Sequence, residues 1–168
     1  ATDVAVLVTA FIIGLGLGQL PAGLLADRFG RRPVLWGGVA IYIVGAIGTA
    51  VAPSLATMAL ARFVWGLGAA GPRVAVTAMI RDSFEGAEMA RQMSNIMAIF
   101  LLVPMVAPSA GAAMVALGSW RYSVLMCAVV GLIVFALSMR LPATLPPDQR
   151  RALNAREITT SWKIVLST

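Results

Sequence analysis

The chain has 168 residues, of which 60% are hydrophobic and only 12% are charged. Because soluble domains carry about 25% charged residues, this chain has too few charges to coat a water-facing globule, and its natural solvent is the lipid bilayer. It contains no His and a single Cys, so an intrachain disulfide and any zinc or Cys/His catalytic site are excluded from this window. We therefore expect no metal, no cofactor and no enzymatic activity.

Five stretches are apolar over about 20 residues, the length of helix that crosses the hydrocarbon core of a bilayer. They lack the two-residue alternation of a barrel wall, so they predict an all-α integral membrane protein. The predicted spans are residues 4–26, 33–52, 55–80, 91–115 and 121–140. Residues 141–168 turn polar and then regain apolar residues at helical spacing, which indicates a cytoplasmic loop with an amphipathic helix, or the approach to a seventh span.

Small residues form a stripe along the first predicted span. They recur every four positions, at Ala10, Gly14, Gly18, Ala22 and Ala26. Small side chains let helix backbones approach closely within a bilayer. We therefore expect a neighbouring helix to lie on this stripe.

The connection after the first span gathers charge in a chain that has little elsewhere. Gly30 can reverse the chain, and Pro33 suits the first turn of the next helix. Asp27 lies at the carboxyl end of its own helix, where the dipole disfavours an anion, so we expect it to pair with one of the arginines that follow it. A conformational latch explains this pattern better than a merely solvated loop. The predicted latch residues are Gly23, Asp27, Arg28, Gly30, Arg31 and Arg32.

The cations indicate how the spans are threaded, since Lys and Arg accumulate in cytoplasmic loops. Ten of the 13 fall on one side: Arg28, Arg31, Arg32, Arg81, Arg91, Arg140, Arg150, Arg151, Arg156 and Lys163. Only Arg121 falls on the other side. The chain then starts outside, and we expect at least one span before Ala1 and more after Thr168. Anionic lipid accounts for the net charge of +6, so no nucleic acid partner is expected.

The third span carries two arginines within the membrane. At about 100° per residue, the eleven positions from Arg62 to Arg73 bring both to one face, which Gly66, Ala69 and Thr77 share. Because a mid-membrane arginine costs about 2.5 to 3.5 kcal/mol, this face is expected to line a cavity or the bundle interior. Snorkelling to the headgroups is the alternative.

Glycines in the same span spell a GxGxxG pattern. Gly66, Gly68 and Gly71 would bind a dinucleotide only after a strand and in water. Here they lie within an apolar helix, so the pattern predicts close helix packing instead.

The fourth span combines methionines and prolines. Met89, Met93 and Met97 are spaced by four, which fits either ordinary packing or an adaptable drug cavity. Pro104 and Pro108 remove backbone donors beside Gly111, so we expect a kink there.

Five stretches resemble motifs of one transporter family. GLLADRFGRR, residues 23–32, resembles the loop signature of the major facilitator superfamily, and RFVWGLGAAG, from Arg62, resembles the arginine motif of its fourth helix. APSAGA, from Ala107, resembles the motif of antiporter fifth helices, while GSWRYSVLM and LPATLPP resemble the start and end of the sixth. Together they resemble the bicyclomycin and multidrug-resistance type of drug:proton antiporter.

The resemblance implies helices two to six of a twelve-helix transporter. Residues 1–140 would form most of its amino-terminal six-helix bundle, and residues 141–168 would belong to its central loop. The missing first helix and the carboxyl-terminal half of the same transporter would be the partners of this chain. The two six-helix bundles would rock against each other and so open a central cavity to one side of the membrane at a time. Three positions depart from the family pattern: Trp65 in place of Gln, Ala107 in place of Gly and Ala143 in place of Glu.

We expect a secondary active transporter of the inner (cytoplasmic) membrane that exports hydrophobic or cationic drugs in exchange for protons. Its seven acidic residues lie in connections or near helix ends, so the proton-binding carboxylate must come from outside this window. One alternative is a transporter of the same fold for a sugar or amino acid, which the apolar Met- and Gly-rich spans disfavour. The other is a non-transporting scaffold, which would need neither the latch nor the arginine face.

Overall fold

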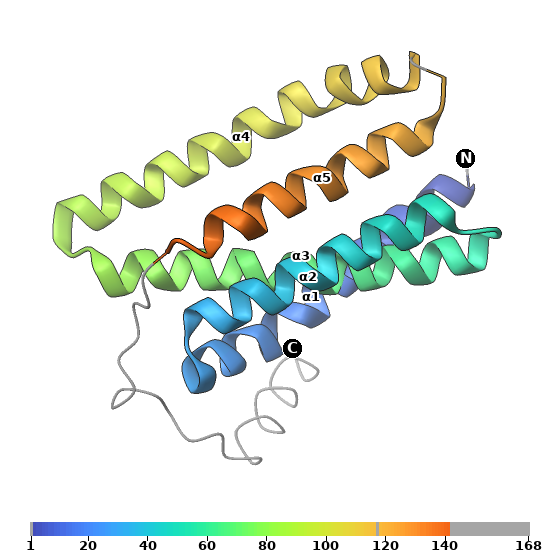
Figure 1. Ribbon diagram of the computed structural model, residues 1–168. Helices are drawn as coiled ribbons and strands as arrows, with labels where there is room; N and C mark the ends of the chain where they lie inside the picture. Colours follow the sequence, from blue (N-terminus) through green and yellow to red (C-terminus); the bar gives the residue numbers. More distant parts are fainter. Residues whose placement is uncertain (1, 117, 142–168) are drawn as a thin grey trace.

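The computed structural model describes residues 2–116 and 118–141 (Figure 1). All regular structure in these residues is helical, and the five helices are α1 (Thr2–Phe29), α2 (Arg31–Val51), α3 (Leu55–Ser83), α4 (Gly86–Ala116) and α5 (Trp120–Ser138). Each is long and apolar enough to cross a membrane, because a helix satisfies its own backbone hydrogen bonds in lipid. The predicted all-α fold with five spans is confirmed. The loop and amphipathic helix predicted for residues 141–168 lie, from residue 142 onward, outside the described residues.

Consecutive helices run in opposite directions (Figure 1). The α1–α2 and α3–α4 connections lie at one end of the bundle together with the end of α5, and the other two connections lie at the opposite end. Arg28 and Arg81 occupy the last turns of α1 and α3, whereas Arg121 is in the first turn of α5. We call the end that holds Arg28 and Arg81 the arginine-rich end. The separation of cations is the one that the threading predicts.

Local sequence explains where the helices begin and end. Gly30 stands alone between α1 and α2 with φ 98° and ψ 163°, a conformation that is nearly exclusive to glycine. Ser54 and Thr57 form a capping box at the start of α3, in which the Ser54 oxygen accepts the Thr57 N–H at 3.3 Å. Ser119 caps α5 by accepting the Arg121 N–H at 3.2 Å. The chain therefore turns sharply between spans.

Helix α3 is the centre of the bundle and packs most extensively on α1 and α2. A Cβ added at Gly14 would lie 2.1 Å from the Phe63 carbonyl oxygen, and one at Gly66 would lie 2.1 Å from that of Phe11. The two backbones thus touch at reciprocal glycines. The predicted contact of a helix with the small-residue stripe of α1 is confirmed.

The other two glycines of the GxGxxG pattern face α2. A Cβ at Gly68 would lie 2.2 Å from the Tyr42 backbone nitrogen, and one at Gly71 would lie 2.8 Å from the Gly38 Cα. Each of the three glycines therefore allows a close approach of a neighbouring backbone. The interpretation of this pattern as helix packing is confirmed.

Helix α4 is peripheral and contacts α5 and α3; no residue of the described part of α4 is buried. Met89 and Met93 are half-buried, and Met97 is 53% exposed. The methionine stripe is therefore not part of the core formed by the described residues. Pro104 and Pro108 lie inside one continuous helix, so the predicted kink stays a prediction.

Candidate functional site

The predicted latch lies at the arginine-rich end, where α1 turns into α2. Gly30 reverses the chain, and Pro33 occupies the first turn of α2. This tight turn brings the last turn of α1 beside the first turn of α2. It places Asp27 and Arg31 four residues apart, but on two different helices.

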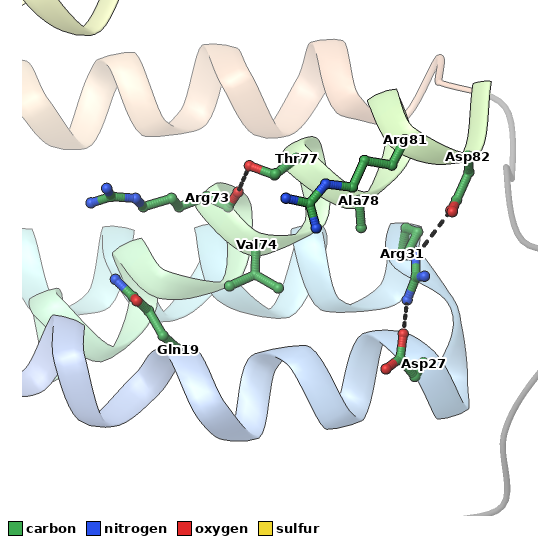
Figure 2. A pocket seen from close by; sticks show the side chains of 9 residues that line it. All are labelled: Gln19, Asp27, Arg31, Arg73, Val74, Thr77, Ala78, Arg81 and Asp82. Atoms are coloured by element: carbon green, nitrogen blue, oxygen red, sulfur yellow. Dashed lines mark hydrogen bonds and ion pairs between the residues drawn. The ribbon is translucent and has the colours of Figure 1, made fainter. Parts of the chain in front are cut away.

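Arg31 joins three helices at this point (Figure 2). Its guanidinium donates to the Asp27 carboxylate of α1, and its Nε donates to Asp82 Oδ2 of α3 at 3.0 Å. The Arg31 side chain is only 12% exposed, so water screens these pairs less than it would on an open surface. We call this group the Asp27–Arg31–Asp82 bridge.

The bridge contains one carboxylate that the sequence indicates and one that it does not. Asp27 was expected to pair with one of three arginines, and the structure selects Arg31. Asp82 was not expected in the latch. Its signal is the same as that of Asp27, because both carboxylates lie at the carboxyl ends of their helices, where the dipole disfavours an anion.

The other two arginines of the latch make different contacts. Arg32 donates to the Met139 carbonyl at the end of α5, and its guanidinium lies 4.5 Å from the Trp36 ring centroid. This contact ties α2 to α5 and places a cation at a helix carboxyl terminus, where the dipole favours it. Arg28 is exposed and lies over the ring of Phe29.

No packing contact in the described residues explains why position 23 is a glycine. A Cβ added there would meet no atom within 4 Å. Its place in the latch therefore stays a prediction.

A cavity of about 340 Å³ lies beside the bridge, between α1 and α3 (Figure 2). Its lining residues are Gln19, Asp27, Arg31, Arg73, Val74, Thr77, Ala78, Arg81 and Asp82. Gln19 was missed by the sequence analysis, although it is the only amide in the first span. The cavity is strongly polar for a membrane bundle, because it holds three arginines and two acids.

Arg62 lies in the half of α3 that is away from the arginine-rich end, against aromatic side chains. Its guanidinium is 4.8 Å from the Trp65 ring centroid, and its buried Nε has no hydrogen-bond partner among the described residues. Trp65 is 6% exposed and makes edge contacts with Phe11 and Tyr42 at centroid distances of 6.0 and 5.5 Å. The tryptophan that departs from the family pattern thus provides the cation–π partner of Arg62.

Arg73 contacts a different region from Arg62. It is exposed, its guanidinium lies 5.7 Å from the Phe100 ring centroid of α4, and its carbonyl accepts the Thr77 hydroxyl at 2.9 Å. Arg73 and Thr77 also line a larger cavity of about 620 Å³. Gly66, predicted on the same face, packs instead on the backbone of α1.

One side-chain hydrogen bond in the described residues links the predicted kink region of α4 to α5. Ser123 donates its hydroxyl to the Gly111 carbonyl at 3.3 Å. A Cβ at Gly111 would meet no atom within 4 Å. Pro104 is exposed.

The acids of the described residues lie at helix ends or in connections. They are Asp3, Asp27, Asp82, Glu85 and Glu88. Within residues 2–116 and 118–141 no three His, Cys, Asp or Glu side chains come together in a way that would hold a metal ion. The described part of the chain thus places no carboxylate at mid-membrane depth.

Five antiparallel apolar helices, closely packed through glycines, define a multi-pass helical membrane protein. The family model of the Major Facilitator Superfamily matches residues 1–168. The chain therefore belongs to the Major Facilitator Superfamily, as its motifs indicated.

Three relatives are drug-resistance proteins by name. The chain is 32% identical to the bicyclomycin resistance protein homolog of Haemophilus influenzae over 92% of the chain and 40% of that protein. It is 34% identical to the chloramphenicol resistance protein of Pseudomonas aeruginosa over 72% of the chain and 29% of that protein. It is 30% identical to the multidrug resistance protein MdtL of Escherichia coli over 78% of the chain and 34% of that protein. The chain thus spans well under half the length of these relatives.

Proposed function

We propose that the protein containing this chain exports apolar drugs across the cytoplasmic membrane in exchange for protons. The observation that carries this proposal is the Asp27–Arg31–Asp82 bridge, in which a glycine hinge supplies the cation that links α1 to α3. Such a bridge fixes the hinge between α1 and α2 at the arginine-rich end, where contacts between this bundle and the other would form in one arrangement and break in the other, as alternating access requires. The names of the relatives supply the substrate class.

We infer that the five helices are helices two to six of a twelve-helix transporter. The matched share of the relatives, 29% to 40% of their length, is somewhat below five twelfths and agrees with a chain that spans fewer than half of the helices. The first helix and the carboxyl-terminal half would complete the bundle and the substrate route. The arginine-rich end would face the cytoplasm, in agreement with the positive-inside rule.

In this mechanism Arg62 couples transport to protons. Its guanidinium is held by Trp65 and has no ion pair within residues 2–116 and 118–141. It would therefore respond to a carboxylate supplied by the rest of the transporter, and protonation of that carboxylate would remove the attraction. Arg62→Ala is expected to abolish gradient-driven efflux and to leave membrane insertion intact.

The test uses the full-length transporter in proteoliposomes loaded with chloramphenicol or a lipophilic cation. An imposed pH gradient is expected to accelerate the movement of at least one of these drugs, and collapse of the gradient by an ionophore is expected to stop the acceleration. A rate of drug transport that is the same with and without the pH gradient would refute proton exchange. Transport of a sugar or amino acid instead of any drug would favour the metabolite alternative.

A further inference from the structure

We propose that Arg32 and Arg121 are two equivalent clamps that hold α2 and α5 together as one rigid pair, whichever side of the membrane the transporter is open to. The inference rests on the alternating access of the proposed function, but it concerns neither the substrate nor the proton. It gives a positioning role to Arg121, which the threading explains only as a lone cation on the outer side. Direct contacts between two described helices carry it.

The two arginines make the same contact at opposite ends of the pair. Helices α2 and α5 run antiparallel and pack against each other (Figure 1), and each arginine is the second residue of its helix. Arg32 donates to the Met139 carbonyl, and Arg121 Nε donates to the Ala50 carbonyl at 2.9 Å. Met139 follows Arg121 by eighteen positions, as Ala50 follows Arg32. The exchange of hydrogen bonds is therefore reciprocal.

Each clamp joins a cation to the carboxyl end of a helix. The last carbonyls of a helix have no partner within it, and the helix dipole favours a positive charge beside them. A tryptophan ring supports each guanidinium: Arg32 lies 4.5 Å from the Trp36 centroid, and Arg121 lies 5.0 Å from that of Trp120. A guanidinium keeps its charge at any physiological pH, so we expect both clamps to persist at pH 5 and at pH 8.

The buried positions of the two helices follow one pattern. Counted from each arginine, the third, seventh and seventeenth residues that follow are buried in both helices. The equivalent pairs are Leu35 and Val124, Val39 and Ala128, and Thr49 and Ser138. In the last pair each hydroxyl donates to a carbonyl of its own helix. The two helices thus present equivalent faces to the bundle.

The middle of the pair shows that the equivalence is a local two-fold axis. Residues on such an axis contact their own equivalents. Tyr42 lies ten positions after Arg32, and Gly131 lies ten positions after Arg121. A Cβ added at Gly131 would lie 3.1 Å from the Cδ1 atom of Tyr42. The axis therefore crosses the pair between Tyr42 and Gly131, about midway between the clamps.

This symmetry suits a part of the transporter that does not change between access states. Inverted repeats relate the two sides of a membrane to each other, and here the α2–α5 pair has the same tie on both sides. The Asp27–Arg31–Asp82 bridge, in contrast, lies at the arginine-rich end. We therefore expect movements of the bundle to leave the distance between α2 and α5 unchanged at both ends.

The experiment measures that distance at each end by electron paramagnetic resonance. Spin labels are attached to cysteine pairs in the full-length protein in lipid nanodiscs, after its native cysteines are replaced by Ser. One pair, Pro33 and Ala136, lies towards the arginine-rich end, and the other, Ile47 and Tyr122, lies towards the opposite end; all four positions are exposed. We expect both distances to be the same at pH 5 and pH 8, with and without chloramphenicol. The maleimide reactivity of a separate Gln19→Cys variant, in the 340 Å³ cavity, reports whether the opening changes between these conditions.

Substitutions assign each end to one arginine. Arg121→Gln is expected to widen the distance distribution of the Ile47–Tyr122 pair about twofold and to leave the other pair unchanged, because a lost hydrogen bond loosens its own end. Arg32→Gln is expected to have the reverse effect. Replacement of either arginine by Lys keeps the charge and a donor, so it is expected to widen the distribution less than Gln does.

Two control variants remove polar groups at the same ends without touching the clamps. Arg28→Gln removes an exposed cation at the arginine-rich end, and Ser54→Ala removes the cap of α3 at the opposite end. Both are expected to leave the two distance distributions unchanged.

Three results would overturn the inference. The first is a wild-type distance that changes with pH or with chloramphenicol, and this measurement decides even if a variant fails to fold. The second is an Arg→Gln variant whose own end keeps its narrow distribution. The third is equal widening of both pairs by a single substitution, because that is a general loss of stability. The distances are measured without a gradient, so a failure of proton exchange in proteoliposomes leaves this inference standing.

Discussion

The replacement of Arg31 by Gln gives the sharpest test of the Asp27–Arg31–Asp82 bridge. The substitution removes the shared cation and leaves two carboxylates near one another, on α1 and α3. Both acids lie near helix carboxyl ends, where the dipoles add to their repulsion. We expect the arginine-rich end to open more often.

The size of the effect follows from the exposure of the three side chains. A fully buried ion pair costs about 3–5 kcal/mol to break, whereas an exposed pair contributes up to about 1 kcal/mol. Arg31 is 12% exposed, but Asp27 is 46% and Asp82 is 22% exposed. Water therefore screens the pairs in part, and their joint contribution is about 2 kcal/mol. That free energy corresponds to a change of about 30-fold in the equilibrium between closed and open arrangements.

The assay measures how fast a thiol reacts in the 340 Å³ cavity beside the bridge. Gln19→Cys is introduced into the full-length protein, and the single cysteine of this chain, Cys127, is replaced by Ser so that it does not react. An impermeant maleimide is then added to inside-out vesicles. We expect Arg31→Gln to raise the labelling rate about 10- to 30-fold, because labelling requires the open arrangement. Arg28→Gln, which removes an exposed arginine of the same loop, is expected to leave the rate near that of the parent protein.

A double substitution separates the bridge from general effects of charge. Asp82→Asn in the Arg31→Gln background removes one unpaired carboxylate, so it is expected to restore part of the slow labelling. Equal labelling rates in the parent protein and in Arg31→Gln would refute the bridge as a closing device. If the effects of the two substitutions on the labelling rate simply added, as free energies, Arg31 and Asp82 would not be coupled.

Three further predictions concern the packing of α3, the hinge and the aromatic support of Arg62. Gly66→Ala is expected to destabilise the full-length protein by about 2 kcal/mol or more, because the added Cβ would overlap the α1 backbone. Gly16→Ala is the control: its added Cβ would have no atom within 4 Å, so the midpoint of thermal unfolding should stay unchanged or rise. Gly30→Ala is expected to cost about 1–3 kcal/mol in the same measurement, because φ is 98° there. Trp65→Leu is expected to lower proton-driven efflux at least tenfold while Trp65→Phe retains most of it, and equal loss in both would show that the ring does not hold Arg62 by a cation–π contact.

Much of the fold follows from the sequence because a bilayer leaves few choices. Apolar length predicts the five helices, and the arginines predict their directions. The close contacts of Gly14, Gly66 and Gly71 follow from small residues at helical spacing. Each of these signals lies within one helix or one loop, so a single sequence is enough to detect it.

The composition of the candidate site was only partly predictable. Asp27 and its need for a cation follow from its position at a helix end, but its second link, through Arg31 to Asp82, depends on α3 lying beside the hinge. The contact of Arg32 with the Met139 carbonyl likewise depends on α5 packing against α2. Helical periodicity predicted one face for Arg62 and Arg73, yet aromatic contacts hold Arg62 beside Trp65, while Arg73 lines the cavities. Which helices are neighbours is a tertiary property that no local pattern encodes.

Sided labelling tests the central claim, that the helices are threaded through the membrane with the Asp27–Arg31–Asp82 bridge at the cytoplasmic end. Single cysteines at Pro53, in the α2–α3 turn, and at Ser83, the last residue of α3, are introduced into the full-length protein in intact cells. An impermeant maleimide is expected to label Pro53→Cys directly and Ser83→Cys only after the membrane is permeabilised. Direct labelling of both cysteines from the outside would contradict the threading and, with it, the role of the bridge.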